Sequence, residues 1–283
     1  MGVLPLDRFP DTHHPMRMAA YKLIALDLDG TLLNSGMKLS EGNTRALQAA
    51  IERGVQVALA TSRWYELALR TANRLGIQTP IIASNGAIVK RPSDGKELLH
   101  LYLDGELARE VVTLADDSGW EIFTTIGSAT YMRMRPGIVP EKLPAGLRIA
   151  ERQSDHLGEA QATCVQIFGE EAVREIEGRF LAKYGDRARF SLNRPVGLPH
   201  YVVLTNPAAD KAGGLELVCR ELGVAPVDTI AMGDSESDLA MLRFAGLGVA
   251  MANSPDEVKR AALHIAPTND EDGVAWAVHK FLL

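Results

Sequence analysis

Short apolar runs alternate with amphipathic stretches over residues 22–90, and this alternation is typical of strands and helices in a parallel α/β sheet. The apolar runs predict strands at Leu23–Leu26, Val55–Ala60 and Pro80–Ala83. Helical spacing predicts helices from Ser40 to about Arg53 and from Tyr65 to Leu75. The first part of the chain is therefore expected to form βαβ units.

The pattern changes over residues 91–199, where apolar and polar residues alternate more regularly. This alternation predicts strands at Leu98–Leu103, Trp120–Ile126, Thr130–Met134, Thr163–Phe168 and Ala188–Leu192. Helical patterns occupy Glu106–Asp117 and Glu171–Tyr184. The stretch Pro136–Gly158 contains prolines and glycines and predicts a long internal loop.

After about His200 the first pattern returns. Strands are predicted at Tyr201–Leu204, Thr229–Met232, Gly248–Met251 and Leu263–Ala266. Helices are predicted near Ala212–Leu222, Ser237–Phe244, Pro255–Ala262 and Gly273–Leu283. We therefore predict an α/β fold with a Rossmann-like parallel-sheet core, formed by residues 21–90 and 200–283, and an inserted α+β domain over residues 91–199.

The first 20 residues contain three prolines and two adjacent histidines but no apolar stretch of the signal-peptide kind. We expect residues 1–20 to be a disordered N-terminal extension, and Met18 is a candidate for the natural start of the chain. No apolar run approaches the roughly 18 residues that a membrane span needs. No membrane partner is therefore expected.

The composition is that of an ordinary globular protein, because 46% of the 283 residues are hydrophobic and 23% are charged. The net charge of −6 and the lack of a basic run argue against a nucleic-acid partner. The two cysteines, Cys164 and Cys219, are isolated in the sequence, which favours reduced thiols in a reducing compartment over a disulfide scaffold. We therefore expect a cytoplasmic protein.

Two aspartates one residue apart, Asp27 and Asp29, follow the first predicted strand. Alternation along a strand points both carboxylates to the same side, where their charges repel unless a cation or a shared proton lies between them. Mg²⁺ binds oxygen ligands and leaves positions for phosphate oxygens, and a carboxylate can also attack phosphorus as a nucleophile. A polar turn after a strand explains the pair equally well by itself.

A second polar segment, Thr61-Ser62-Arg63, follows the second predicted strand. Ligands of open parallel sheets bind at the carboxyl ends of the strands. The hydroxyl groups, the backbone amides and the following helix N-terminus of this segment suit an anion. For this segment alone, an ordinary helix N-cap is the better explanation.

Two more segments place charged residues where strands meet helices. Asp234 follows the strand Thr229–Met232, and Asp238 lies one helical turn further on, so both carboxylates can face one site. The alternative is an acidic helix start that interacts favourably with the helix dipole. Lys211 opens a helix, where a cation is unfavourable unless an anion is its partner, although a surface lysine is the simpler explanation of Lys211 alone.

Four segments resemble, in their order, the four motifs of the haloacid dehalogenase superfamily: Asp27-Leu28-Asp29-Gly30-Thr31, Thr61-Ser62-Arg63, Lys211 and Gly233-Asp234-Ser235-Glu236-Ser237-Asp238. The insertion between the second and third motifs resembles the type IIB cap domain of the Cof-type sugar-phosphate phosphatases. Two further segments are similar to the same branch, namely Ser84-Asn85-Gly86-Ala87 and Asn269-Asp270-Glu271-Asp272-Gly273-Val274. The resemblance runs from about Lys22 to Leu283.

The resemblance implies a catalytic role for each charged motif residue. Asp27 would be the nucleophile that forms an aspartyl-phosphate, and Asp29 would protonate the leaving alcohol and then activate water. Mg²⁺ would be bound by Asp27, by the backbone carbonyl of Asp29 and by Asp234, while Asp238 would align these ligands. Lys211 would neutralise the charge of the phosphoryl group.

The phosphoryl group would also be bound by uncharged groups. These are Thr61, Ser237 and the backbone amides of Leu28 and Ser62. Ser62 stands where the Cof branch often has glycine, and Ser237 stands where it usually has asparagine, so the contacts made by those two residues are in question. Ala252-Asn253 replaces a more usual Gly-Asn, which affects backbone geometry but no catalytic group.

The implied function is a magnesium-dependent phosphatase that hydrolyses small phosphate monoesters, with sugar phosphates as the expected substrates. A small phosphorylated metabolite is the expected partner, and the protein would be a monomer or a homodimer. A phosphomutase of related fold, a phosphoaspartate receiver module and a sugar-phosphate-binding pseudoenzyme are the alternatives. The sequence leaves the substrate open.

Candidate contacts of the substrate in the cap are Arg133, Arg135 and His100, although surface positions explain them better. Trp64 and Tyr65 are candidates for the entrance of the site. Packing on the core or on the helix surface explains these two residues equally well.

Overall fold

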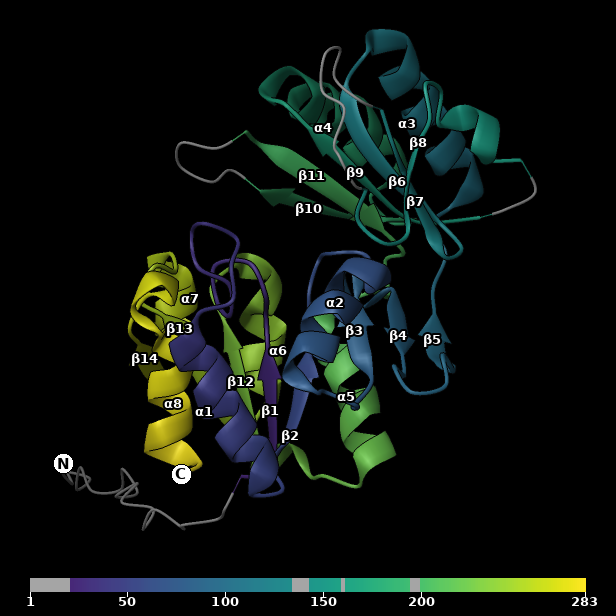
Figure 1. Cartoon of the computed structure of the whole chain (residues 1–283). Coiled ribbons are helices and arrows are strands. Elements are labelled where there is room, and N and C mark those ends of the chain that lie inside the picture. The colour runs from purple at the N-terminus through teal and green to yellow at the C-terminus, as the bar shows by residue number, and fades with distance from the viewer. Residues whose placement is uncertain (1–20, 134–142, 159–160, 194–198) are drawn as a thin grey trace, which may run out of the picture.

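The computed structural model describes residues 21–133, 143–158, 161–193 and 199–283. The expected extension over residues 1–20 lies outside these residues. The described chain forms two parts, one above the other, and each part has its own sheet and helices (Figure 1). The α/β fold with a parallel core and an additional α+β part, which the sequence predicts, is confirmed.

The lower part contains a five-stranded sheet in the order β14-β13-β12-β1-β2. Its strands are β1 (Leu23–Leu26), β2 (Gln56–Leu59), β12 (Thr229–Gly233), β13 (Leu247–Met251) and β14 (His264–Ala266). All neighbouring strands are parallel. Every residue of β1 is buried, since helices cover both faces of the sheet, and this explains why β1 is continuously apolar in the sequence.

The helices of the lower part are α1 (Glu41–Glu52), α2 (Tyr65–Leu75), α5 (Lys211–Leu222), α6 (Leu239–Phe244), α7 (Asp256–Ala261) and α8 (Gly273–Phe281). Alternate residues of β1 point to the two faces of the sheet. Ile24 packs in a hydrophobic cluster with Leu47 of α1, whereas Ala25 packs in another with Leu215 of α5. The predicted cap of α1 is present, because the side chain of Ser40 accepts a hydrogen bond from the backbone of the helix.

A small antiparallel sheet extends the lower part. It consists of β3 (Ile81–Ala83), β4 (Ile88–Lys90) and β5 (Glu97–His100), and a parallel bridge between Ala60 and Ile82 joins it to the end of β2. The strand expected at Leu98–Leu103 was assigned to the inserted domain, and this was wrong. It forms β5, which pairs with β4. Leu98 and Leu99 of β5 pack against the hydrophobic cluster that includes Leu215 of α5.

The upper part contains a six-stranded sheet in the order β10-β11-β9-β6-β7-β8. Its strands are β6 (Glu121–Ile126), β7 (Ala129–Met132), β8 (Leu147–Ile149), β9 (Ala162–Phe168), β10 (Arg189–Asn193) and β11 (Tyr201–Thr205). Two helices, α3 (Gly105–Ser118) and α4 (Glu170–Tyr184), cover the face that points away from the lower part (Figure 1). They enclose a separate hydrophobic cluster.

Two further predictions about this region were wrong. The strand expected at Tyr201–Leu204 was assigned to the parallel core, but β11 pairs antiparallel with β9 and β10 of the upper sheet. A short buried apolar run looks the same in either kind of sheet, so the sequence pattern did not identify the partners. The expected loop Pro136–Gly158 contains β8, which pairs with β7, and its residues 136–142 lie outside the described part.

The division into a core and a cap stays a proposal. With β5 in the lower part and β11 in the upper sheet, we propose that the chain leaves the core after β5 and returns to it after β11.

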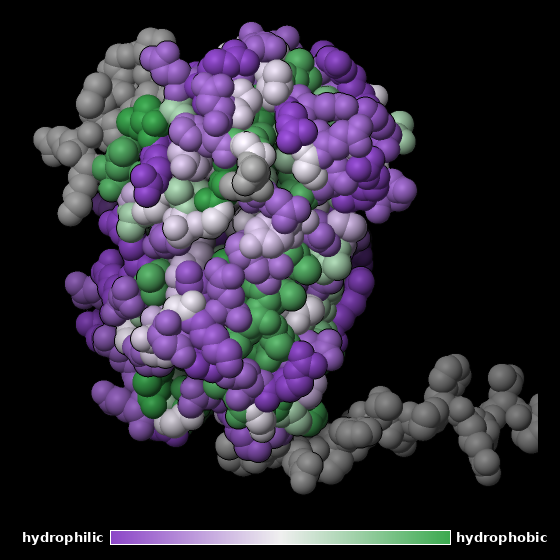
Figure 2. Space-filling view, turned by 90° about the vertical axis from the view of Figure 1, so that its right-hand side faces the viewer, coloured by the Kyte–Doolittle hydropathy of each residue, from purple (hydrophilic) through white to green (hydrophobic). Residues whose placement is uncertain are grey.

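Polar side chains cover most of one outer side of the molecule, and apolar side chains appear between them in both parts (Figure 2). Among the described residues, no helix is both long and apolar enough to cross a membrane.

The two cysteines are free and buried, which allows a test of the fold. Burial raises the pKa of the Cys164 thiol to about 12, and burial also raises the pKa of Cys219. Because the thiolate is the reactive form, we expect neither thiol to react measurably with iodoacetamide near pH 8 in the native protein. Mass spectrometry should find both alkylated after unfolding in guanidinium chloride, and rapid native labelling of Cys164 would contradict its buried position.

Candidate active site

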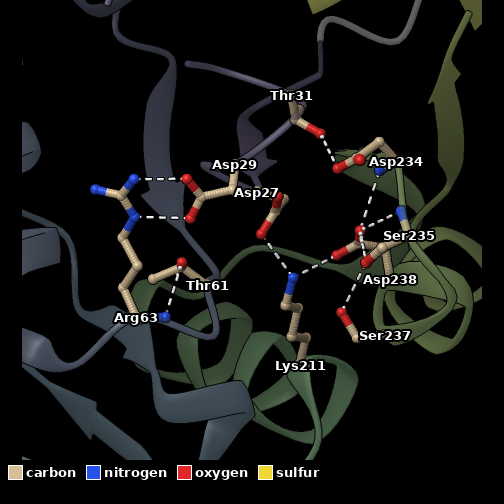
Figure 3. A network of polar contacts seen from close by, with 10 residues as sticks. All are labelled: Asp27, Asp29, Thr31, Thr61, Arg63, Lys211, Asp234, Ser235, Ser237 and Asp238. Carbon is tan, nitrogen blue, oxygen red and sulfur yellow. Dashed lines mark hydrogen bonds and ion pairs between the residues drawn. The ribbon is translucent and has the colours of Figure 1, made fainter. Parts of the chain in front are cut away.

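The motif residues meet at one edge of the parallel sheet. Asp27 follows β1, Thr61 lies just after β2, and Asp234 follows β12. These strands pair in parallel and their carboxyl ends coincide, so residues far apart in the sequence become neighbours. Lys211 reaches the same place from the first residue of α5 (Figure 3).

Lys211 links two carboxylates in the centre of the site (Figure 3). Its Nζ atom lies 2.6 Å from Oδ1 of Asp27 and 2.6 Å from Oδ1 of Asp238. All three side chains are buried. Burial alone lowers the pKa of Lys211, but the two carboxylates outweigh burial and raise it above its ordinary value, so the ammonium group stays charged.

Asp238 connects Lys211 to the loop that follows β12. While its Oδ1 atom accepts from Lys211, its Oδ2 atom accepts hydrogen bonds from the backbone amides of Asp234, at 3.0 Å, and Ser235, at 2.9 Å. The hydroxyl group of Ser235 also donates to Oδ2, at 3.0 Å. Asp238 therefore holds the loop after β12 and fixes the ammonium group of Lys211 at the same time.

Asp234 faces the loop that follows β1. Its Oδ1 atom accepts a hydrogen bond of 3.0 Å from the hydroxyl group of Thr31. A Cβ atom on Gly30 would lie 2.3 Å from Oδ2 of Asp234, and the φ angle of Gly30 is +79°. Both the close approach and the left-handed backbone require glycine, which explains why Gly30 stands at this position.

The carboxylates form a set that suits a hard divalent cation. Oxygen atoms of Asp27, Asp234 and Asp238 lie within 4.8 Å of one another. Burial raises the pKa of Asp27 well above its ordinary value, although Lys211 opposes this effect. Burial and the charge of Asp238 raise the pKa of Asp234 to about 7. A cation bound here would stabilise the ionised carboxylates, and an all-oxygen donor set fits Mg²⁺.

Asp29 points away from this cluster, toward Arg63 (Figure 3). The guanidinium group donates from Nε to Oδ2 of Asp29, at 2.7 Å, and from Nη2 to Oδ1, at 2.5 Å. This bidentate pair occupies both carboxylate oxygens of Asp29. Sequence reasoning identified Arg63 only as part of a motif and missed this contact, because a side-chain partner 34 residues away leaves no local signal.

The expected phosphoryl ligands have different surroundings. Thr61 is fully buried, and its hydroxyl oxygen accepts a hydrogen bond of 3.1 Å from the amide of Arg63. The side chain of Leu28 is also buried. Ser62 and Ser237 both line a cavity above the carboxylates, where the hydroxyl groups of Ser237 and Ser235 lie 2.9 Å apart.

This catalytic cavity has a volume of about 480 Å³ and lies between the two parts of the molecule. Its floor includes Asp27, Asp29, Lys211 and Asp234. The sequence assigned no role to several other lining residues, which are Asn85, Leu192, Asn193, Tyr201, Ser235, Glu236, Asn253 and Pro255. Leu192, Asn193 and Tyr201 come from the upper sheet, so their approach to Asp27 depends on how the two parts pack and has no counterpart in the sequence pattern.

Asn85, to which the sequence assigned no role, is a polar group in this cavity. It is buried, and within the described residues its Oδ1 atom has no hydrogen-bond partner. The φ angle of Asn85 is +54°, and a Cβ atom on the following Gly86 would lie 2.1 Å from the carbonyl oxygen of Asp210. The turn that carries Asn85 is therefore packed tightly against the residue before Lys211.

Two of the three candidate substrate contacts, Arg133 and His100, belong to the described residues. Arg133 donates to the carbonyl oxygen of Glu151 and pairs with Asp116 inside the upper part, and Arg135 is not among the described residues. His100, at the end of β5, forms a contact of 2.8 Å with the hydroxyl group of Thr163 in β9. Neither Arg133 nor His100 lines the described part of the catalytic cavity.

Comparison with known proteins identifies the family of this chain. A family model described as haloacid dehalogenase-like hydrolase matches residues 24–278. Phosphatase YwpJ of Bacillus subtilis (strain 168) is 30% identical over 289 residues, which cover 92% of this chain and 100% of that protein. The 5-amino-6-(5-phospho-D-ribitylamino)uracil phosphatase YitU of the same organism is 30% identical over 262 residues, which cover 89% of this chain and 94% of that protein.

Solved structures show the same architecture. A haloacid dehalogenase-like hydrolase from Bacteroides thetaiotaomicron is 27% identical to this chain and superposes with a TM-score of 0.77. The superposition covers 92% of this chain and 99% of that chain. The agreement therefore includes both parts of the molecule.

Proposed function

The chain belongs to the haloacid dehalogenase-like hydrolases and is a phosphatase of phosphate esters, and from this premise we propose that it is magnesium-dependent and hydrolyses small phosphate monoesters through an aspartyl-phosphate on Asp27. Sugar phosphates are the proposed substrates. The observation that carries this proposal is the pairing of Asp27 with Lys211 beside Asp234 on the floor of the cavity.

The nucleophile of this proposal is Asp27. Lys211 binds Oδ1 of Asp27 and so restrains the carboxylate, and its charge opposes the burial that raises the pKa of Asp27. A carboxylate oxygen of Asp27 attacks phosphorus, and the bond between phosphorus and the oxygen of the leaving alcohol breaks. Lys211 then also stabilises the negative charge on the phosphoryl oxygens.

Proton transfer is the proposed role of Asp29. It donates a proton to the oxygen of the leaving alcohol and later takes one from the water that attacks the aspartyl-phosphate, which releases phosphate and restores Asp27. Both oxygens of Asp29 accept hydrogen bonds from Arg63 in this structure. Arg63 therefore fixes the position of the carboxyl group, and each oxygen keeps a second lone pair that can take up a proton.

The metal ligands are proposed from the fit of the donor set. Asp27, Asp234 and the backbone carbonyl of Asp29 would hold Mg²⁺, and Asp238 would align them through the loop after β12. When bound, Mg²⁺ supplies positive charge that offsets the charge of the transferred phosphoryl group. Thr61, Ser62, Ser237 and the amide of Leu28 are proposed to bind phosphoryl oxygens.

Removal of the metal tests this proposal. We expect the purified protein to hydrolyse p-nitrophenyl phosphate in the presence of Mg²⁺, and excess EDTA to lower the rate by at least roughly a hundredfold, because the clustered carboxylates would lose their countercharge. Released phosphate is the measurement, and added Mg²⁺ should restore the rate. Full activity in EDTA would exclude a metal-dependent reaction.

The same assay separates the alternatives. A phosphomutase would convert a sugar phosphate into an isomeric sugar phosphate instead of releasing phosphate. A receiver module would give a long-lived phosphoprotein without turnover. Location in the cytoplasm and the monomeric or homodimeric state stay predictions.

A further inference from the structure

Four aromatic side chains form a row that ends at the catalytic cavity. Trp64, just before α2, stacks on Phe123 of β6 with ring centroids 5.8 Å apart. Phe123 meets Phe168 of β9 edge to face at 5.5 Å, and Phe168 lies 5.5 Å from the ring of Tyr201 in β11. Tyr201 lines the cavity that contains Asp27, so the row runs from the N-terminus of α2 to the wall of the catalytic cavity.

The row lies on the face of the upper sheet that is turned toward the lower part. Side chains alternate along a strand, and the direct neighbours of these aromatic residues pack under α3 and α4, namely Ile122, Ile167 and Val202. Phe123, Phe168 and Tyr201 therefore point to the opposite face. Figure 1 shows that this face of the upper sheet is turned toward the lower part, which contains the parallel sheet.

The row is not part of a hydrophobic core. None of the four aromatic residues belongs to the hydrophobic clusters found in the described chain, and each of them is partly exposed. Exposed aromatic surface is unfavourable in water. Packing between the two parts accounts for Trp64, whose indole donates to the carbonyl oxygen of Ala145, but it does not account for Tyr201 at the cavity wall.

Tyr201 offers both a ring and a hydrogen-bond donor to a ligand. Burial and the nearby carboxylates, Asp29 first among them, raise the pKa of Tyr201 to about 12. Its hydroxyl group is therefore protonated at neutral pH. Asn193 lies directly opposite Tyr201 in the pairing of β10 with β11 and lines the same cavity, so an amide is available beside the ring.

We propose that the phosphate ester hydrolysed at this site carries a planar unsaturated ring on its leaving group, and that this ring stacks on Tyr201 at the cavity end of the aromatic row. The inference rests on the proposed function, because it takes the phosphoryl group to lie at Asp27. Planar rings stack favourably on aromatic side chains whatever their exact substituents. In a sugar or polyol phosphate joined to such a ring, the phosphoryl group would lie at Asp27 and the ring at Tyr201.

A matched pair of substrates tests this inference. Ribose 5-phosphate and uridine 5′-monophosphate share the same kind of phosphorylated primary alcohol, but only the second carries a planar ring. We expect kcat/KM of the wild-type protein to be about tenfold or more higher for uridine 5′-monophosphate, which is the order expected for the stacking of one ring. Tyr201→Leu should remove most of this preference, and Tyr201→Phe should keep most of it because the ring remains.

Tyr131→Leu is the matched control. Tyr131 is a partly exposed tyrosine on β7 that stacks on His156, with centroids 4.2 Å apart, and it lies outside the aromatic row. Its replacement should leave the ratio of the two kcat/KM values unchanged. Equal kcat/KM values of the wild-type protein for both substrates, or an equal loss for both in Tyr201→Leu, would overturn the inference.

Binding separates this inference from the proposed function. Calorimetric titration of an Asp27→Asn variant with each compound, in the presence of Mg²⁺, measures recognition without turnover. Tighter binding of uridine 5′-monophosphate that is lost on adding Tyr201→Leu supports the aromatic contact even if the wild-type protein releases no phosphate. Equal or absent binding of the two compounds contradicts it, whatever the catalytic rates are.

Discussion

Replacement of Asp27 by asparagine is expected to abolish hydrolysis of phosphate esters. Asparagine has nearly the same shape but lacks the carboxylate that attacks phosphorus, and loss of a nucleophile commonly lowers kcat by roughly 10⁴-fold or more. The fold should remain, because Lys211 keeps its contact of 2.6 Å with Asp238, and one of the mutually repelling carboxylates is gone. Release of phosphate from p-nitrophenyl phosphate measures the effect.

Two controls make the Asp27→Asn result specific. Asp186 is exposed and lies outside the catalytic cavity, so Asp186→Asn should keep the wild-type rate. Circular dichroism should show unchanged secondary structure for both variants. Substantial magnesium-dependent hydrolysis by Asp27→Asn, with rates near those of Asp186→Asn, would rule out Asp27 as the nucleophile.

Replacement of Lys211 by methionine is expected to cost stability as well as activity. The methionine side chain fills similar space, but it leaves the buried carboxylates of Asp27 and Asp238 without the ammonium group that both contact. Removing one partner of a buried ion pair typically lowers the free energy of unfolding by about 3 to 5 kcal/mol. Urea denaturation in the presence of EDTA measures this change.

Lys183→Met is the control for this effect. Lys183 pairs with Glu110 at 2.8 Å, but both side chains are largely exposed, at 52% and 41%, so the pair contributes less than about 1 kcal/mol. Mg²⁺ should restore part of the stability of Lys211→Met, since it would supply the missing positive charge. If the two variants unfold at the same urea concentration, the buried network does not stabilise the fold.

The sequence predicted most elements of the fold for a physical reason. A strand buried on both faces must be apolar throughout, as β1 is, and a helix such as α1 must have a capping group and an apolar stripe. These requirements act over a few residues and are visible locally. Strand partners are not local, and for this reason the sheets that contain β5 and β11 were assigned wrongly.

The motif residues of the site were also visible in the sequence, since each of them stands where a strand ends or a helix begins. Asp27, Thr61, Lys211 and Asp234 do meet at one edge of the parallel sheet. Their catalytic roles stay predictions until the variants are measured. The bidentate contact between Asp29 and Arg63 was not predicted, because it depends on side-chain directions in two loops.

The sequence by itself determined the charged groups and the strand ends that carry them, because chemistry and local periodicity are properties of short segments. Only the tertiary structure decided what lies above those groups. Tyr201 and Asn193 reach the cavity because β10 and β11 belong to the upper sheet and that sheet lies over the carboxylates. This packing joins residues from separate parts of the chain, and it sets the space and the contacts that a leaving group meets.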